Sequence, residues 1–132
     1  MHGHRDTVLS LNAGGAFRDK SQLVEFLSHI TESWAIMFVQ EIDKHFGHDQ
    51  GDRKLQPLGC HYLARCWAGP GSLPHGIIVH RDVIHDVKTV RFVERCVRID
   101  LKSRMLDKSS QRGITSMLGI HTPHNNIEEF YC

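Results

Sequence analysis

The run Ala35-Ile36-Met37-Phe38-Val39, followed by Gln40-Glu41, decides the expected fold. Five consecutive apolar residues are typical of a strand that is covered on both faces. Such strands are found in sheets with parallel pairing and with helices packed against them. The run therefore predicts an interior strand of an α/β sheet, with an amide and a carboxylate at its carboxyl end.

The residues before this run complete a strand–helix–strand unit. Thr7-Val8-Leu9-Ser10-Leu11 predicts a short strand that ends at Asn12, and the paired glycines 14 and 15 indicate a turn. Asp19 predicts a helix start, with Gln22 at the spacing of a capping box. Four apolar residues at i, i+3, i+4 and i+7 give this helix one buried face: Leu23, Phe26, Leu27 and Ile30. The order of the elements favours parallel or near-parallel pairing of the two strands.

The rest of the chain predicts further strands. Residues 43–58 read as a polar loop, 59–64 as a candidate strand, and 76–80 as a short buried strand. Apolar and polar residues alternate from Val87 onward, which is typical of a strand with one wet face. In residues 97–102 the apolar set is Val97, Ile99 and Leu101, and the polar set is Arg98, Asp100 and Lys102. Residues 108–113 predict a hairpin loop, 114–120 its return strand, and 126 onward a capped helix.

The bulk composition restricts the class of protein. A chain of 132 residues suits one domain, and 40% hydrophobic with 23% charged residues is typical of a globular protein. The formal net charge of +1 gives no strong field to recruit nucleic acid or an acidic membrane. No apolar run has the length of a membrane span, and the first residues lack the apolar core of a signal peptide. An intracellular protein without membrane association is expected.

The cysteines and histidines carry weaker information. Four cysteines are scattered along the chain, which predicts free thiols: Cys60, Cys66, Cys96 and Cys132. Cys60, His61 and Cys66 match no common zinc spacing. Eleven histidines spread over the whole chain indicate compositional bias, and a metal-binding regulatory protein that uses them is kept as an alternative. Arg81 and Asp82 follow a strand, where a solvated turn is favoured over a phosphate contact.

Three predicted strand ends carry polar side chains that can converge. They are Asn12, Glu41 and His121, and sites in α/β sheets gather just beyond the carboxyl ends of strands. Glu41 is a candidate ligand for Mg²⁺, with Mn²⁺ as a substitute. His121 is a candidate general acid or base, or a hydrogen-bond donor to a phosphate oxygen. Asn12 could orient a phosphate or a metal-bound water. Each residue also has a structural alternative: Glu41 as a surface carboxylate, His121 as a loop residue before Pro123, and Asn12 as a turn residue beside Gly14.

These segments resemble the endonuclease/exonuclease/phosphatase superfamily, whose fold is DNase I-like. Residues 8–12 are similar to its opening strand, which ends in an active-site Asn, and residues 36–41 to its second motif, whose Glu binds the metal. Residues 76–79 resemble its central strand, and residues 120–125 a later strand that ends near the catalytic site. The resemblance covers nearly the whole chain in the right order, and it extends to nuclease domains of LINE-type retroelements.

The resemblance implies a fold and a function. The implied fold is α/β, an incomplete four-layer α/β/β/α sandwich with mixed sheets, in which residues 1–132 form a single partial domain truncated at the C-terminus. The implied function is Mg²⁺-dependent hydrolysis of phosphodiester bonds in nucleic acid, DNA foremost. Glu41 would be the metal ligand, and Asn12 and His121 the catalytic residues. A retroelement origin would place the protein in the nucleus.

The sequence also departs from the family. A later Gly-Asp-x-Asn strand end and a terminal Ser-Asp-His, which normally face the metal and the attacking water, do not occur here. Loss of such groups commonly costs orders of magnitude in rate, so impaired hydrolysis is expected. A half-sandwich should also expose apolar sheet faces and self-associate. The alternatives are a non-catalytic remnant with a binding role, and a phosphoesterase that acts on phosphoinositides or small phosphoesters.

Overall fold

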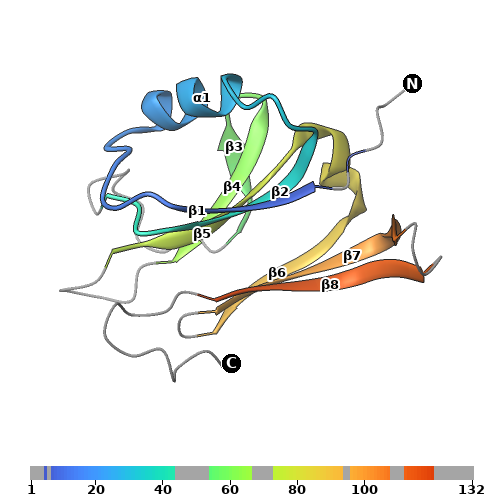
Figure 1. Ribbon diagram of the computed structural model, residues 1–132. Coiled ribbons are helices and arrows are strands. Elements are labelled where there is room, and N and C mark those ends of the chain that lie inside the picture. The colour runs from blue at the N-terminus through green and yellow to red at the C-terminus, as the bar shows by residue number, and fades with distance from the viewer. Residues whose placement is uncertain are drawn as a thin grey trace.

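The computed structural model describes residues 5, 7–43, 54–66, 73–93, 96–107 and 112–120 and shows a mixed α/β architecture (Figure 1). The elements in chain order are β1 (Thr7–Asn12), α1 (Lys20–Ser28), β2 (Trp34–Gln40), β3 (Gln56–Leu58), β4 (His61–Cys66), β5 (His75–Val79), the 3-10 helix η1 (Arg81–Asp86), β6 (Val87–Val93), β7 (Cys96–Asp107) and β8 (Arg112–Ile120). None of the helices among these residues has the length and apolar character needed to cross a membrane.

The first sheet contains five strands in the order β1-β2-β5-β4-β3. β1 pairs with β2 in parallel, as the strand–helix–strand order predicted, and the other pairs are antiparallel. β2 lies inside the sheet, and six of its seven residues are buried. The prediction of a covered interior strand at this run is confirmed.

α1 covers one face of the first sheet (Figure 1). The Asp19 side chain accepts a hydrogen bond of 3.0 Å from the Gln22 backbone N–H and so caps the helix as predicted. The Gln22 side chain returns to the backbone N–H of Arg18, one residue before the cap. Leu23 and Leu27 are buried against the sheet and Phe26 is partly buried there, which confirms these three residues of the predicted apolar face. Ile30, the fourth, lies beyond the end of α1.

The second sheet is antiparallel, in the order β6-β7-β8, and lies on the opposite face of the first sheet from α1 (Figure 1). Val97, Ile99 and Leu101 of β7 point into the core between the sheets, as their alternation predicted. That core also takes side chains from β2, β4, β5 and β6: Ala35, Ile36, Phe38, Ala64, Cys66, Ile77, Val79 and Phe92. The described chain therefore has three layers, with one core under α1 and a second between the sheets.

Both apolar faces of the first sheet are covered, in contrast to the exposed sheet faces expected from the sequence. Among the residues whose side-chain burial the structure describes, the exposed large hydrophobic residues are Val8 and Val93. The two sheets bury their apolar faces against each other, and α1 covers the remaining face of the first sheet. The expected self-association stays a prediction.

Two other expectations need correction. Residues 43–58 are not all loop, because Gln56–Leu58 forms the edge strand β3 and pairs with β4. Pro57 hid this strand in the sequence, although proline is tolerated at a sheet edge. Cys60 and Cys66 are free thiols as predicted, whereas Cys96 is in a disulfide bond. The helix predicted from residue 126 onward lies outside the described residues.

Candidate functional site

Asn12 and Glu41 meet at the carboxyl ends of the parallel strands β1 and β2. The register pairs Asn12 with Gln40, which places Glu41 one residue beyond the ladder. The Asn12 side-chain amide donates a hydrogen bond of 2.7 Å from Nδ2 to Glu41 Oε2. Two of the three side chains predicted to converge are therefore in direct contact.

The backbone after both strands is held in a fixed arrangement. Ala13 N donates to Gln40 O over 2.8 Å, and Gly15 N donates to Glu41 O over 2.7 Å. Glu41 itself has a positive φ of 56°, in the left-handed region that costs a non-glycine residue roughly 1–2 kcal/mol. The loop contacts hold this conformation, and a strained residue in a polar cluster is a feature of functional sites.

Asn12 makes two side-chain contacts, one of which is the turn beside Gly14 that was its structural alternative. Its Oδ1 atom accepts a hydrogen bond of 2.9 Å from Gly14 N, which closes a side-chain turn after β1. Its amide nitrogen at the same time holds the carboxylate of Glu41. Because the amide oxygen already binds backbone, Asn12 acts in this structure by orienting Glu41.

The site fits Mg²⁺ in the kind of ligand that it offers. Glu41 supplies carboxylate oxygens, which Mg²⁺ prefers, and this ion commonly keeps several waters around one or two protein carboxylates. Across the described ranges, no group of three or more His, Cys, Asp or Glu residues is arranged to hold a metal ion. Glu41 therefore suits a hydrated ion that substrate phosphates also bind, rather than a closed protein cage. The third predicted site residue, His121, lies outside the described residues.

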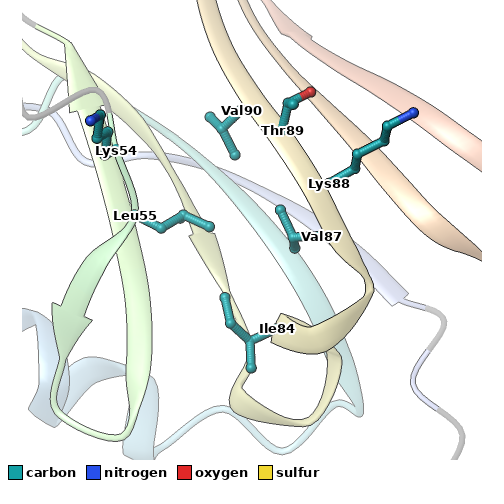
Figure 2. A pocket seen from close by; sticks show the side chains of 7 residues that line it. All are labelled: Lys54, Leu55, Ile84, Val87, Lys88, Thr89 and Val90. Carbon is teal, nitrogen blue, oxygen red and sulfur yellow. The ribbon is translucent and has the colours of Figure 1, made fainter.

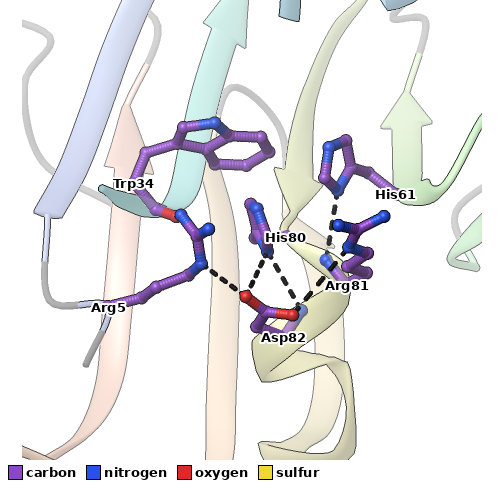
Figure 3. A network of polar contacts seen from close by, with 6 residues as sticks. All are labelled: Arg5, Trp34, His61, His80, Arg81 and Asp82. Carbon is purple, nitrogen blue, oxygen red and sulfur yellow. Dashed lines mark hydrogen bonds and ion pairs between the residues drawn. The ribbon is translucent and has the colours of Figure 1, made fainter. Parts of the chain in front are cut away.

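A second polar cluster, which we call the histidine network, lies at the opposite end of the first sheet (Figure 3). It consists of Arg5, Trp34, His61, His80, Arg81 and Asp82. The guanidinium of Arg5 donates to Asp82 Oδ2 over 2.7 Å from Nε and to the Trp34 carbonyl over 3.2 Å. Asp82 is thus ion-paired, so the prediction of a solvated turn at this residue is wrong.

Both imidazoles of the histidine network accept hydrogen bonds from the start of η1. His80 Nδ1 accepts from Asp82 N over 3.0 Å, and His61 Nδ1 accepts from Arg81 N over 3.1 Å. Burial, with nearby Arg5 next in importance, lowers the pKa of His80 to about 4. Burial and then the charge of Arg81 also lower the pKa of His61. Neutral rings are what these backbone hydrogen bonds require.

The histidine network has a structural role that its geometry explains. The ring of His80 packs edge-on against Trp34, with a centroid distance of 4.9 Å, and lies 4.4 Å from the ring of His61. These contacts fix η1 to β2 and β4. One part of this network had a local signal in the sequence: His80 stands two residues before Asp82, a spacing that suits a capping turn. The partner Arg5 had no such signal.

An apolar hollow of about 270 Å³ opens beside η1 and β6 (Figure 2). Leu55, Ile84, Val87 and Val90 line it, and in Figure 2 the ammonium groups of Lys54 and Lys88 point away on opposite sides. The lining offers no converging polar groups of the kind that catalysis requires. The Asn12–Glu41 pair is therefore the better candidate site.

Comparison with known proteins assigns no family. No protein-family model matches the chain, and neither a curated protein nor a solved structure matches it. The functional assignment therefore rests on the residues at the ends of β1 and β2.

Proposed function

We propose that the Asn12–Glu41 pair belongs to a site for Mg²⁺-dependent hydrolysis of phosphodiester bonds in nucleic acid. The observation that carries this proposal is the carboxylate of Glu41, held by an amide at the carboxyl ends of two parallel strands. The resemblance of residues 8–12 and 36–41 to the endonuclease/exonuclease/phosphatase superfamily supports it. On this proposal, α1 and the two sheets correspond to three layers of the superfamily's α/β/β/α sandwich.

The chain's own residues would divide the work as follows. Glu41 would hold Mg²⁺, which when bound polarises a phosphoryl oxygen and stabilises the leaving oxygen. Asn12 keeps Glu41 Oε2 in one orientation through its amide N–H. His121 is proposed, from the resemblance alone, to donate to a phosphate oxygen or to exchange a proton with the reacting groups.

Hydrolysis should be slow. The Gly-Asp-x-Asn and Ser-Asp-His motifs that activate water in the superfamily do not occur in this sequence. Removal of one such group commonly costs two or more orders of magnitude in rate. A measurable rate would then come from charge stabilisation by the ion at Glu41 together with the positioning that Asn12 provides.

The test is nicking of supercoiled plasmid by the purified chain with Mg²⁺, with Mn²⁺ and with EDTA. We expect slow nicking that needs the divalent ion and is lost in the Glu41→Gln variant. Glu25→Gln is the matched control, because Glu25 is an exposed carboxylate on α1. Asn12→Ala should lower the rate and keep the metal dependence. Equal nicking by the wild type and by Glu41→Gln would contradict the proposal.

Two further arms separate the alternatives. Cleavage of a small phosphodiester or a phosphoinositide, with the plasmid left intact, would assign a different substrate class to the same site. Metal-independent retention of plasmid without any cleavage would identify a binding protein and overturn the hydrolytic proposal.

A further inference from the structure

The outer face of the second sheet concentrates positive charge. Lys88 and Arg91 on β6 and Arg98 on β7 lie around a single carboxylate, that of Asp100. The whole chain has a formal net charge of only +1. This group of cations is therefore a local feature, which bulk composition did not reveal.

Two of these cations lie directly opposite each other. The register pairs Arg91 of β6 with Arg98 of β7. Like charges opposite each other on neighbouring strands destabilise a sheet, so the pair needs a compensating group. Asp100 provides it: Arg98 Nε donates to Oδ1 over 2.9 Å, and an Arg91 terminal nitrogen donates to Oδ2 over 3.2 Å.

The same carboxylate takes two neutral donors. Thr89 Oγ1 donates to Asp100 Oδ2 and Ser116 Oγ donates to Oδ1, each over 2.8 Å. Hydrogen bonds from Thr89, Ser116 and Arg98 hold the pKa of Asp100 well below its usual range. Four donors match the number of acceptor positions on one carboxylate. Asp100 is thus saturated by groups of the protein itself.

The arginines retain capacity to bind a further anion. Their side chains are 64% (Arg91) and 48% (Arg98) exposed, and Asp100 accepts a hydrogen bond from only one nitrogen of each guanidinium. A second nitrogen of Arg98 donates to Ser116 Oγ over 3.4 Å. The two guanidinium groups and Lys88 border a hollow of about 310 Å³, together with Thr89, Asp100, Leu101 and Ser116. Three cations against one carboxylate leave this hollow with an excess of two positive charges.

The chemistry of the hollow selects the ligand. A guanidinium that a carboxylate holds through one nitrogen keeps its other N–H groups for phosphate oxygens, which it can bind in a planar fork. No aromatic side chain is among the residues that line the hollow, so stacking on bases is not offered there. The site would therefore bind phosphate groups without discriminating between bases.

We propose that Arg91 and Arg98, organised by Asp100 and supported by Lys88, form a clamp for the phosphodiester backbone of a nucleic-acid strand. The choice of nucleic acid rests on the proposed function. The clamp itself lies on the second sheet, whereas Glu41 follows a strand of the first. It would hold substrate without taking part in the chemical step.

The test is fluorescence anisotropy of a labelled single-stranded oligonucleotide in EDTA, across a series of salt concentrations. The Arg91→Gln/Arg98→Gln double variant should bind at least about tenfold more weakly. Its plot of log affinity against log salt should flatten by roughly 1.4, since each phosphate contact in a single strand contributes about 0.7. The Lys20→Gln/Lys54→Gln variant loses two exposed cations elsewhere and should bind like the wild type.

Further arms make the result specific. Arg91→Lys/Arg98→Lys keeps the charge and should keep the salt slope while it loses affinity, because a lysine cannot form the bidentate fork. Equal binding by the wild type and by Arg91→Gln/Arg98→Gln would overturn the clamp. An equal loss of affinity in the Lys20→Gln/Lys54→Gln control would also overturn it. Displacement of the oligonucleotide by inorganic phosphate, at concentrations close to the oligonucleotide's own dissociation constant, would overturn the assignment of a nucleic-acid ligand.

The clamp and the hydrolytic site fail separately. Glu41→Gln should bind the oligonucleotide like the wild type in EDTA, although it no longer nicks plasmid. Retained binding with no nicking in any variant would contradict only the proposed function. Retained nicking with unchanged binding in the double glutamine variant would contradict only the clamp. Circular dichroism of each variant verifies that it is folded.

Discussion

Gly119 of β8 lies directly against the ring of Phe38 in β2, so that a methyl group at residue 119 would overlap Phe38 Cδ1. Gly119 pairs with Val97, which is buried in the core between the sheets. The glycine is therefore needed for space. Its missing side chain lets the last described strand approach the first sheet.

The Gly119→Ala substitution should destabilise the protein by about 1–3 kcal/mol, because overpacking of a closely packed core displaces its neighbours. Urea unfolding measures the loss. In the Phe38→Leu background the same substitution should cost less, since a smaller side chain leaves room for the methyl group. Strictly additive effects of the two substitutions would show that the contact does not limit the packing of the sheets.

The strained backbone of Glu41 separates the role of its side chain from that of its conformation. Glu41→Gly and Glu41→Ala both remove the carboxylate, but only glycine adopts a φ of 56° without steric cost. The glycine variant should therefore be more stable than the alanine variant by about 1 kcal/mol. Both should lose metal-dependent nicking. An alanine variant at least as stable as the glycine variant would show that the left-handed conformation is absent in solution.

His80 should make stability depend on pH. Its pKa is about 4 in the folded chain, against 6.5 as the ordinary value, so the unfolded chain binds more protons between these values. The contribution is present in full above pH 6.5 and is lost as pH falls towards 4. A shift of this size corresponds to roughly 3 kcal/mol.

The measurement for His80 is urea unfolding at several pH values between 4.5 and 7.5. The His80→Asn variant keeps an acceptor near the backbone N–H of Asp82 but does not titrate, so its stability should vary less over this range. A wild type and variant with parallel pH profiles would assign the acid sensitivity to other groups. His61, whose pKa is also lowered, is the first of these.

The ion pair between Arg5 and Asp82 should couple the segment before β1 to η1. Both side chains are about four-fifths buried, at 23% and 21% exposed, and their contact is 2.7 Å. A double-mutant cycle with Arg5→Met and Asp82→Asn should give a coupling energy of about 1 kcal/mol, above the usual value for an exposed pair. Raised salt should reduce it only slightly, because the pair is partly shielded. A coupling of zero would assign the fixing of η1 to the two histidines alone.

Local patterns predicted the first sheet well where each signal lies within a few residues. Asp19 and Gln22 marked the helix start, and the run at 35–39 marked an interior strand. The antiparallel neighbour of β2 could not be read in this way, because β5 is brought beside it by packing and not by a short turn. The disulfide at Cys96 was missed for the same reason, since spacing along the chain does not reveal pairs made in space.

The candidate site was predictable in part. Asn12 and Glu41 each follow a strand, and parallel strands bring their carboxyl ends to one edge. The hydrogen bond between the two side chains, and the positive φ of Glu41, required the structure. The proposed clamp at Arg91 and Arg98 could not be predicted from the sequence. The alternation of apolar and polar residues indicated only a solvent-exposed face, and the strand register was needed to place the two arginines opposite each other.

The parallel pairing of β1 and β2 has a consequence for the order in which the molecule assembles. Asn12 and Glu41 are 29 residues apart, whereas Arg5 and Asp82 are 77 apart. Closing the longer loop costs roughly 1 kcal/mol more in chain entropy, and local contacts tend to form first during folding. Substitutions in the β1–α1–β2 unit should then slow folding, while Gly119→Ala should mainly speed unfolding. The edge that carries Glu41 would thus exist in the nascent fold before the second sheet docks.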